Sequence, residues 1–221
     1  MKKYLAEGLV IFASIFASFS VENIRQDSIE KEILNEAVIT LGDEIESNIK
    51  YTKEHLKQIK NFNYVMESIY NDFENISMND IYNLHSNNPY IYNIVENGNI
   101  EYNLQYNDSY FVFAWWNAWE PEDVFFQSML YSGKLLEIKN KKLRKEIESI
   151  YTKHEERVSG MTNYTRNNSD KIMSWFEDGK NNFDRDILNE ELFNNYKDQE
   201  LKNLLKFRSD NLTGRVDNLE N

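Results

Sequence analysis

The sequence predicts a mainly α-helical fold: an N-terminal transmembrane helix that continues into a long amphipathic helix, and a helical bundle with a small β-hairpin insertion. Three observations lead to this prediction. The chain of 221 residues contains only 7 Gly and 2 Pro, so residues that end helices are scarce. Apolar residues recur in steps of three and four along most of it. An apolar run with a single charge stands near the N-terminus.

We accordingly divide the chain into a membrane anchor, residues 1–21, and a helical bundle domain, residues 22–221, with the hairpin at residues 90–106. Hydrophobic residues make up 41% of the chain and charged residues 28%, which favours a folded core over disorder. The net charge of −12 repels phosphate backbones, so we expect no nucleic-acid partner. The absence of cysteine excludes disulfides, thiolate metal sites and cysteine nucleophiles.

The apolar run extends over residues 4–21 and follows Lys2 and Lys3. A membrane span needs about 20 apolar residues. A signal peptide cut near Ser18-Phe19-Ser20 is the alternative, but the helical pattern continues past Ser20 without a turn signal. We therefore expect an uncleaved single-pass anchor in a bacterial inner membrane. The basic residues predict a cytoplasmic N-terminus and a periplasmic bundle.

Small residues lie four apart within the anchor, Ala13 with Ala17 and Ser14 with Ser18. Such spacing lets two membrane helices approach closely. We expect lipid to surround the apolar run. The spacing of small residues predicts that a second copy, or another membrane protein, packs against this face. The alternative is that small residues are merely tolerated here.

Glu7 is the one charged residue of the apolar run. An ionisable group inside a span is a functional hypothesis, here an intramembrane carboxylate that handles ions or protons. The competing interpretation pairs Glu7 with Lys3 and places its charge at the helix N-terminus, where a carboxylate is favourable.

Residues 22–62 contain no Pro and predict a long amphipathic helix. Together with the anchor this helix would reach about 85–90 Å. Its apolar stripe must be buried on another helix of this chain or on a second subunit. The stripe consists of Ile29, Ile33, Ala37, Leu41, Ile45, Ile49, Thr52, Leu56 and Ile59.

Residues 64–85 predict one or two shorter helices, the second with Ser77 as its N-cap. The runs 90–95 and 100–104 are rich in β-branched and aromatic residues and flank Asn97-Gly98, which is the strongest short hairpin signal. A hairpin alone is marginally stable, so we expect it to lie against the helices.

Three of the four tryptophans, Trp115, Trp116 and Trp119, fall in a predicted helix over residues 110–119. The favoured interpretation is that this helix is the buried centre of the bundle. The alternatives are an aromatic-lined pocket or an interfacial belt at the membrane surface.

The acidic residues that follow, Glu120, Glu122 and Asp123, predict the first turn of the next helix, which Gly133 ends. A second long helix is predicted over residues 136–179 with a bend near Gly160, as an antiparallel partner for the first. A shorter helix capped by Asp184 and a C-terminal helix with Leu201, Leu204 and Leu205 complete the bundle.

Motifs for phosphate loops, dinucleotide binding, nucleophile elbows and zinc proteases are absent from the sequence. His154-Glu155-Glu156 would need further ligands to hold a metal, and a solvated helix face is the favoured interpretation. We predict no cofactor, metal or catalytic residue, and the sequence offers no motif that argues for an enzyme.

Two stretches resemble a family of uncharacterised bacterial membrane-anchored proteins. The first is Glu7–Arg25, with Glu before a short apolar span, small residues at Ser14 and Ser18, and a polar exit. The second is residues 118–151, AWEPEDVFFQSMLYSGKLLEIKNKKLRKEIESIY. The resemblance implies one span, an inside N-terminus and a helical extramembrane domain, without an activity. This chain departs from the family in its short basic leader and in Ile24, where the family has Trp.

Three functional hypotheses follow. The first is an interaction or assembly subunit of a membrane complex that acts through the small-residue face. The second is an ion- or proton-handling subunit that uses Glu7. The third is a ligand-binding or enzymatic bundle with a pocket near Trp115, Trp116 and Trp119.

Overall fold

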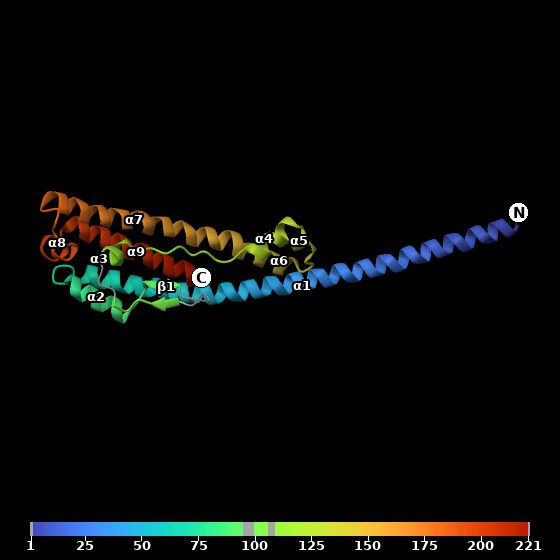
Figure 1. Ribbon diagram of the computed structural model, residues 1–221, viewed down its shortest axis with the longest axis horizontal. Helices are drawn as coiled ribbons and strands as arrows, with labels where there is room; N and C mark the ends of the chain where they lie inside the picture. Colours follow the sequence, from blue (N-terminus) through green and yellow to red (C-terminus); the bar gives the residue numbers. More distant parts are fainter. Residues whose placement is uncertain (1, 95–99, 106–108, 221) are drawn as a thin grey trace. The chain divides into compact units, whose positions relative to one another are not determined.

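The structure is a computed structural model that describes residues 2–94, 100–105 and 109–220. Within these ranges some side chains lie outside the described part, namely those of 2–13, 15–17, 19–24, 27, 94, 109–111, 154 and 155. The described residues are mainly helical, with one small antiparallel sheet, as the sequence predicts (Figure 1).

The longest element, α1, is one helix from Lys2 to Asn71. The other elements are α2 (Met78–Asn87), β1 (Tyr92–Ile94), β2 (Ile100–Tyr102), α3 (Ser109–Ala114), α4 (Val124–Tyr131), α5 (Lys134–Glu137), α6 (Lys141–Ser149), the π-helical segment η2 (Ile150–His154), α7 (Glu155–Asn182), α8 (Asn189–Tyr196) and α9 (Gln199–Glu220). Contacts divide the chain into two units: Met1–Ser47 with Glu122–Ile147, and Asn48–Pro121 with Glu148–Asn221.

In the first unit, a side chain of α1 caps the short helix α4. The backbone N–H groups of Phe125 and Phe126 donate to the two carboxylate oxygens of Glu44, at 2.6 and 3.2 Å. A carboxylate is favourable there because the first N–H groups of a helix lack backbone partners. The predicted first turn at Glu120, Glu122 and Asp123 is therefore wrong, since these acids precede the helix and the capping group comes from α1.

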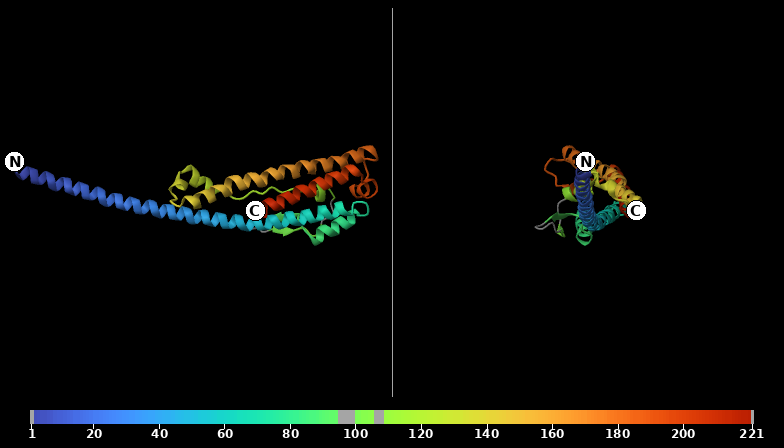
Figure 2. Two further views of the ribbon diagram at one scale, coloured as in Figure 1. Left: turned by 180° about the vertical axis from the view of Figure 1, so that it is seen from behind. Right: turned by 90° about the vertical axis from the view of Figure 1, so that its right-hand side faces the viewer.

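The second unit is a bundle built on three helical segments. The part of α1 from Asn48 onward, α7 and α9 form it, and α9 runs antiparallel to α7 after the turn through α8 (Figures 1 and 2). The helix α3 places Val112 and Phe113 in the interior. The core is aromatic and aliphatic, with Ile59, Phe62, Val65, Met66, Ile69, Phe113, Ile172, Phe176, Phe193, Leu201, Leu205 and Leu212 among its members. This bundle confirms the predicted mainly helical fold. The predicted antiparallel pairing of the two long helices is wrong, because α7 runs in the same direction as α1 and α9 is the helix antiparallel to both (Figure 1).

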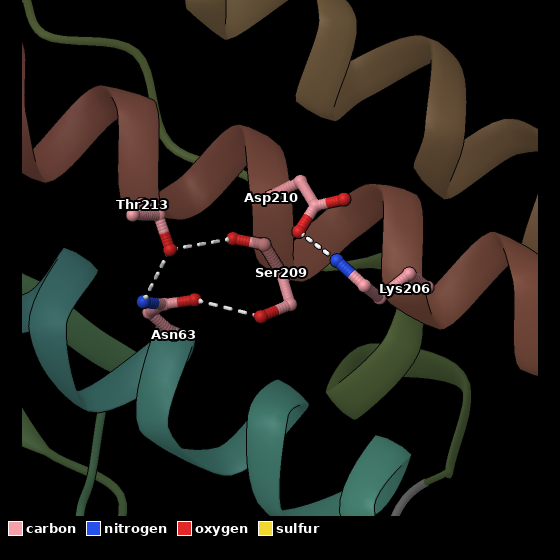
Figure 3. A network of polar contacts seen from close by, with 5 residues as sticks. All are labelled: Asn63, Lys206, Ser209, Asp210 and Thr213. Atoms are coloured by element: carbon pink, nitrogen blue, oxygen red, sulfur yellow. Dashed lines mark hydrogen bonds and ion pairs between the residues drawn. The ribbon is translucent and has the colours of Figure 1, made fainter.

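A hydrogen-bonded network joins α1 to α9 at the edge of this core (Figure 3). The amide nitrogen of Asn63 donates to Thr213 Oγ1 at 3.1 Å, and Ser209 Oγ donates to Asn63 Oδ1 at 3.3 Å. Thr213 Oγ1 in turn donates to the carbonyl of Ser209. Both ends of the Asn63 amide are thus satisfied, which makes this contact specific for one alignment of the two helices.

The predicted hairpin is confirmed. The strands β1 and β2 pair antiparallel, with Tyr92 opposite Tyr102 and Ile94 opposite Ile100. The predicted turn at Asn97-Gly98 lies outside the described residues. Ser77 caps α2 as predicted, in a capping box in which Ser77 and Asp80 each bond the other's backbone N–H.

The predicted stripe on α1 matches the covered face only in part, at Leu41, Ile45, Thr52 and Ile59. Ile29 and Ile33 are 42% exposed and Ile49 is 49% exposed. The face that is mostly covered repeats in alternating steps of three and four, as in a heptad seam. Its members are Leu34, Val38, Leu41, Ile45, Asn48, Thr52, His55, Ile59, Phe62, Met66 and Ile69. Because polar residues occupy the middle of this seam, a search for apolar periodicity does not identify it.

Helix boundaries also differ from the sequence prediction. The helix before the tryptophans, α3, ends at Ala114, and the irregular segment 115–121 follows it. The long helix predicted over residues 136–179 is divided: α5 ends at Glu137, α6 begins at Lys141, and the π-helical segment η2 joins α6 to α7, which continues through Gly160. Gly133 ends α4 as predicted and has the positive φ of 77° that favours glycine.

Within the described part of the chain, none of the helices combines the length and apolar character that a membrane crossing needs. Most side chains of the predicted anchor, residues 1–21, lie outside the described residues.

Two glycines of α7 provide a matched test of helix packing. A Cβ atom on Gly179 would lie 2.6 Å from Leu192 Cδ2, whereas one on Gly160 would meet nothing within 4 Å. We expect Gly179→Ala to lower the free energy of unfolding by about 1–2 kcal/mol, because the buried Leu192 must move. Gly160→Ala should raise it by about 0.5–1 kcal/mol, because Ala favours the helix. Urea unfolding of both variants measures these changes in the free energy of unfolding. Changes of the same sign in the two variants would contradict the packing of α8 on α7.

Candidate functional site

The predicted helix-packing face is partly described. The side chains of Ser14 and Ser18 are exposed, and Ser18 Oγ donates to the carbonyl of Ser14 at 2.9 Å. This bond satisfies the hydroxyl within its own helix. The side chains of Ala13, Ala17 and Glu7 lie outside the described residues.

The structure does not bring the three predicted tryptophans to one place. Trp115 packs edge-on against Phe62, with ring centroids 5.0 Å apart. Trp116 is exposed, with the guanidinium of Arg166 above its ring at 4.9 Å. Trp119 is buried, and its indole N–H donates to Thr52 at 3.0 Å. Each ring has its own neighbours, so the arrangement favours structural roles for them.

A buried polar layer crosses the bundle of the second unit, and sequence reasoning missed it. Its central residues are His55 on α1, Asn117 in the irregular segment and Arg215 on α9. Arg215 Nη2 donates to the Asn117 carbonyl at 2.6 Å and contacts His55 Nε2 at 3.2 Å. Because an arginine only donates, His55 must accept at Nε2 and carry its proton on Nδ1.

The Asn117 side chain completes this layer. Its amide lies 3.4 Å from His55 Nδ1, 3.1 Å from Gln58 Oε1 and 3.1 Å from the Tyr92 hydroxyl. The amide nitrogen of Asn117 is the donor in the contacts with Gln58 and Tyr92. The layer therefore links α1, β1, the irregular segment and α9 through side chains whose donors and acceptors must match.

Burial sets the protonation of this layer. Burial, and then the positive charge of Arg215, lower the pKa of His55 from 6.5 to about 3. Burial lowers the pKa of Arg215 to about 10, which still leaves it charged at neutral pH. His55 is thus neutral and Arg215 is cationic. Among the described residues, Nε and Nη1 of Arg215 have no hydrogen-bond partner, and Nη2 contacts His55 and a carbonyl.

A second buried arginine of α9, Arg208, shows how the fold satisfies such a group. Its Nε donates to Asn168 at 2.7 Å, its Nη2 to Ser169 at 2.6 Å, and its Nη1 to the Phe113 carbonyl. Its guanidinium also lies over the Phe62 ring at 5.5 Å. Every nitrogen of Arg208 therefore has a partner, unlike those of Arg215.

A sequence signal for both arginines existed. Core positions on α9 alternate in steps of three and four, at Leu201, Leu205, Arg208, Leu212 and Arg215. Two arginines thus occupy core positions of a heptad seam. Charged residues at such positions are buried only when something compensates them.

An open pocket of about 650 Å³ lies among α7, α8 and α9 in the same unit. Trp175, Phe183 and Tyr196 line it, and the last two rings stack with centroids 4.1 Å apart. Its charged lining residues are Lys171, Asp178, Asp198 and Glu200, so acids outnumber bases. The indole N–H of Trp175 donates to Asp198 at 3.0 Å. We call it the α7–α8 pocket; its size suits a small-molecule site.

Comparison with known proteins gives no match: no family model, no curated protein and no solved structure is similar to this chain. Among the described side chains, no group of three or more His, Asp or Glu is placed to hold a metal ion. The arrangement offers binding groups, namely a buried cation and an aromatic pocket.

The buried histidines predict a loss of stability in acid. The unfolded state takes up a proton on each histidine below pH 6.5, whereas the folded state resists protonation of His55 to about pH 3 and of His85 to about pH 4. The stability contributed by each buried neutral histidine is therefore fully present well above pH 6.5. It falls as the pH drops, with a slope approaching about 1.4 kcal/mol per pH unit for each histidine.

Replacing one of these histidines tests this contribution. His55→Gln should make the decrease between pH 6.5 and pH 4 shallower than in the wild type, as measured by urea unfolding across pH. His85→Gln is the matched variant, because burial alone lowers its pKa. A wild-type slope retained in both variants would show that neither histidine is buried in its neutral form.

Proposed function

We propose that this chain is a membrane-anchored helical interaction module that assembles through the N-terminal part of α1. The observation that carries the proposal is the continuity of α1. The apolar run of residues 4–21 and the buried seam from Leu41 to Ile69 belong to one unbroken helix. An anchor that continues directly into the folded part connects the bundle to a lipid bilayer without a separate linker.

The partner that fits this segment is a second copy of the chain. Ser14 and Ser18 expose a face of small residues in the single chain, and small residues four apart suit the close approach of identical helices. Ile29 lies about three turns beyond Ser18 and so on nearly the same side of the helix. Ile29 and Ile33 are 42% exposed, which extends this face with apolar side chains.

The proposed location is a bacterial inner membrane, with the N-terminus cytoplasmic and the bundle periplasmic, because Lys2 and Lys3 precede the apolar run. The resemblance of Glu7–Arg25 to anchored proteins supports the same placement. The intact mass of the protein purified from membranes distinguishes an anchor from a signal peptide. A protein that lacks its first twenty residues would reject the anchor.

The assembly proposal predicts a position-specific effect. Ser18→Leu should weaken self-association of the full-length protein in mild detergent by about tenfold, or about 1.4 kcal/mol, because the larger side chain holds the helices apart. Ser20→Leu introduces the same change about 200° away around the helix and should leave association unchanged. Analytical ultracentrifugation measures both. A wild-type monomer, or equal effects of the two changes, would rule out this interface.

The α7–α8 pocket favours a second candidate function, the binding of an organic cation. Trp175, Phe183 and Tyr196 offer aromatic rings, whose faces attract cations. Phe183 is 56% exposed and Tyr196 is 43% exposed, which is unusual for stacked rings that serve only as core. The excess of carboxylates in the lining adds a favourable potential for a positive ligand.

Choline and its neutral isostere 3,3-dimethylbutanol test this candidate. Choline should bind more tightly than the isostere, and Trp175→Phe should weaken it by about fivefold, or about 1 kcal/mol. Trp116→Phe, at an exposed tryptophan outside the pocket, is the matched control and should have no effect. Calorimetric titration measures the affinities. Equal binding of choline and the isostere would exclude recognition of the cation.

A further inference from the structure

The guanidinium of Arg215 is the least satisfied polar group in the described interior. It is fully buried, with 0% exposure. A guanidinium has five N–H groups, and only those of Nη2 have partners, the Asn117 carbonyl and His55. Nε and Nη1 have none among the residues that the structure describes. Three buried N–H groups that carry positive charge therefore face no acceptor.

The described groups in contact with Arg215 carry no negative charge. His55 is neutral and acts as an acceptor, Asn117 offers a carbonyl, and Tyr51 is a phenol whose pKa is raised by burial. Arg208, two turns earlier on the same helix, shows that neutral oxygens suffice where the fold provides one for each nitrogen. In the part of the chain that the structure describes, no such oxygen bonds Nε or Nη1 of Arg215.

We propose that Arg215 binds a small monovalent anion, of the halide class, within the buried polar layer formed with His55 and Asn117. Such an ion balances the buried charge and accepts N–H groups that the protein leaves unpaired. The site is distinct from the α7–α8 pocket, whose lining does not include Arg215.

The geometry selects a spherical ion over a carboxylate or phosphate. Planar or tetrahedral oxyanions bind arginine through two parallel N–H groups on one edge. Both such edges of a guanidinium include Nη2, which in Arg215 is occupied by Asn117 and His55. The free groups, Nε and Nη1, lie on different edges. A halide accepts a single N–H from either of them and needs no second parallel donor.

The test compares potassium bromide with potassium gluconate at equal ionic strength, using the full-length protein. Bromide at a few hundred millimolar should raise the Tm by about 2–5 °C over gluconate. Arg215→Met should abolish this difference. Lys206→Met removes an exposed cation from the same helix and should retain it.

A crystal of the wild-type protein grown in bromide provides a readout that needs no variant. An anomalous bromide peak in contact with Nε or Nη1 of Arg215, together with the Tm shift, would establish the site. A peak without a Tm shift would mean an adventitious ion only and would overturn the proposal. Water at Nε and Nη1 with no bromide peak would also overturn it, as would equal Tm values in the two salts.

Discussion

The second unit depends on how the heptad seam of α1 is buried against α9. Apolar positions from Ile59 to Ile69 pack with Leu201, Leu205 and Leu212, and this part supplies the hydrophobic stabilisation. Toward Asn48 the same seam becomes polar, and His55 meets Arg215 there. A polar layer within a helical seam stabilises less than an apolar one, but it admits only the alignment in which donors meet acceptors. The Asn63–Thr213 contact limits the alignment in the same way.

Much of the fold follows from short-range sequence signals. The capping box at Ser77, the paired strands and the positive φ at Gly133 each depend on residues within a few positions of one another. These features are predictable from sequence because neighbouring residues determine the local backbone geometry. The long helices were also predictable, since a chain with so little Gly and Pro has few places to stop.

The polar positions of the buried face were not predictable in the same way. An apolar stripe assigns Ile49 to the interior and His55 to the surface, whereas the structure reverses both. The burial of His55 depends on Arg215, which lies 160 residues later and has no local signal that names its partner. Likewise, Glu44 caps α4 from a distant part of the sequence. Residues whose roles depend on a distant partner are the ones that a single sequence misplaces.

The candidate sites also divide into those that local sequence patterns predict and those that depend on residues far apart in the chain. The spacing of small residues at Ala13, Ser14, Ala17 and Ser18 is a local pattern, so it is visible in the sequence. The α7–α8 pocket requires three helices to meet, and Trp175 shows no sequence feature that separates it from the tryptophans at 115–119. Clustering in sequence drew attention to Trp115, Trp116 and Trp119, yet each of these packs against a different neighbour. Binding sites on a helical bundle form where side chains from different helices come together in space. A buried arginine without a counter-charge is therefore a stronger sign of a ligand than aromatic residues that are adjacent in sequence.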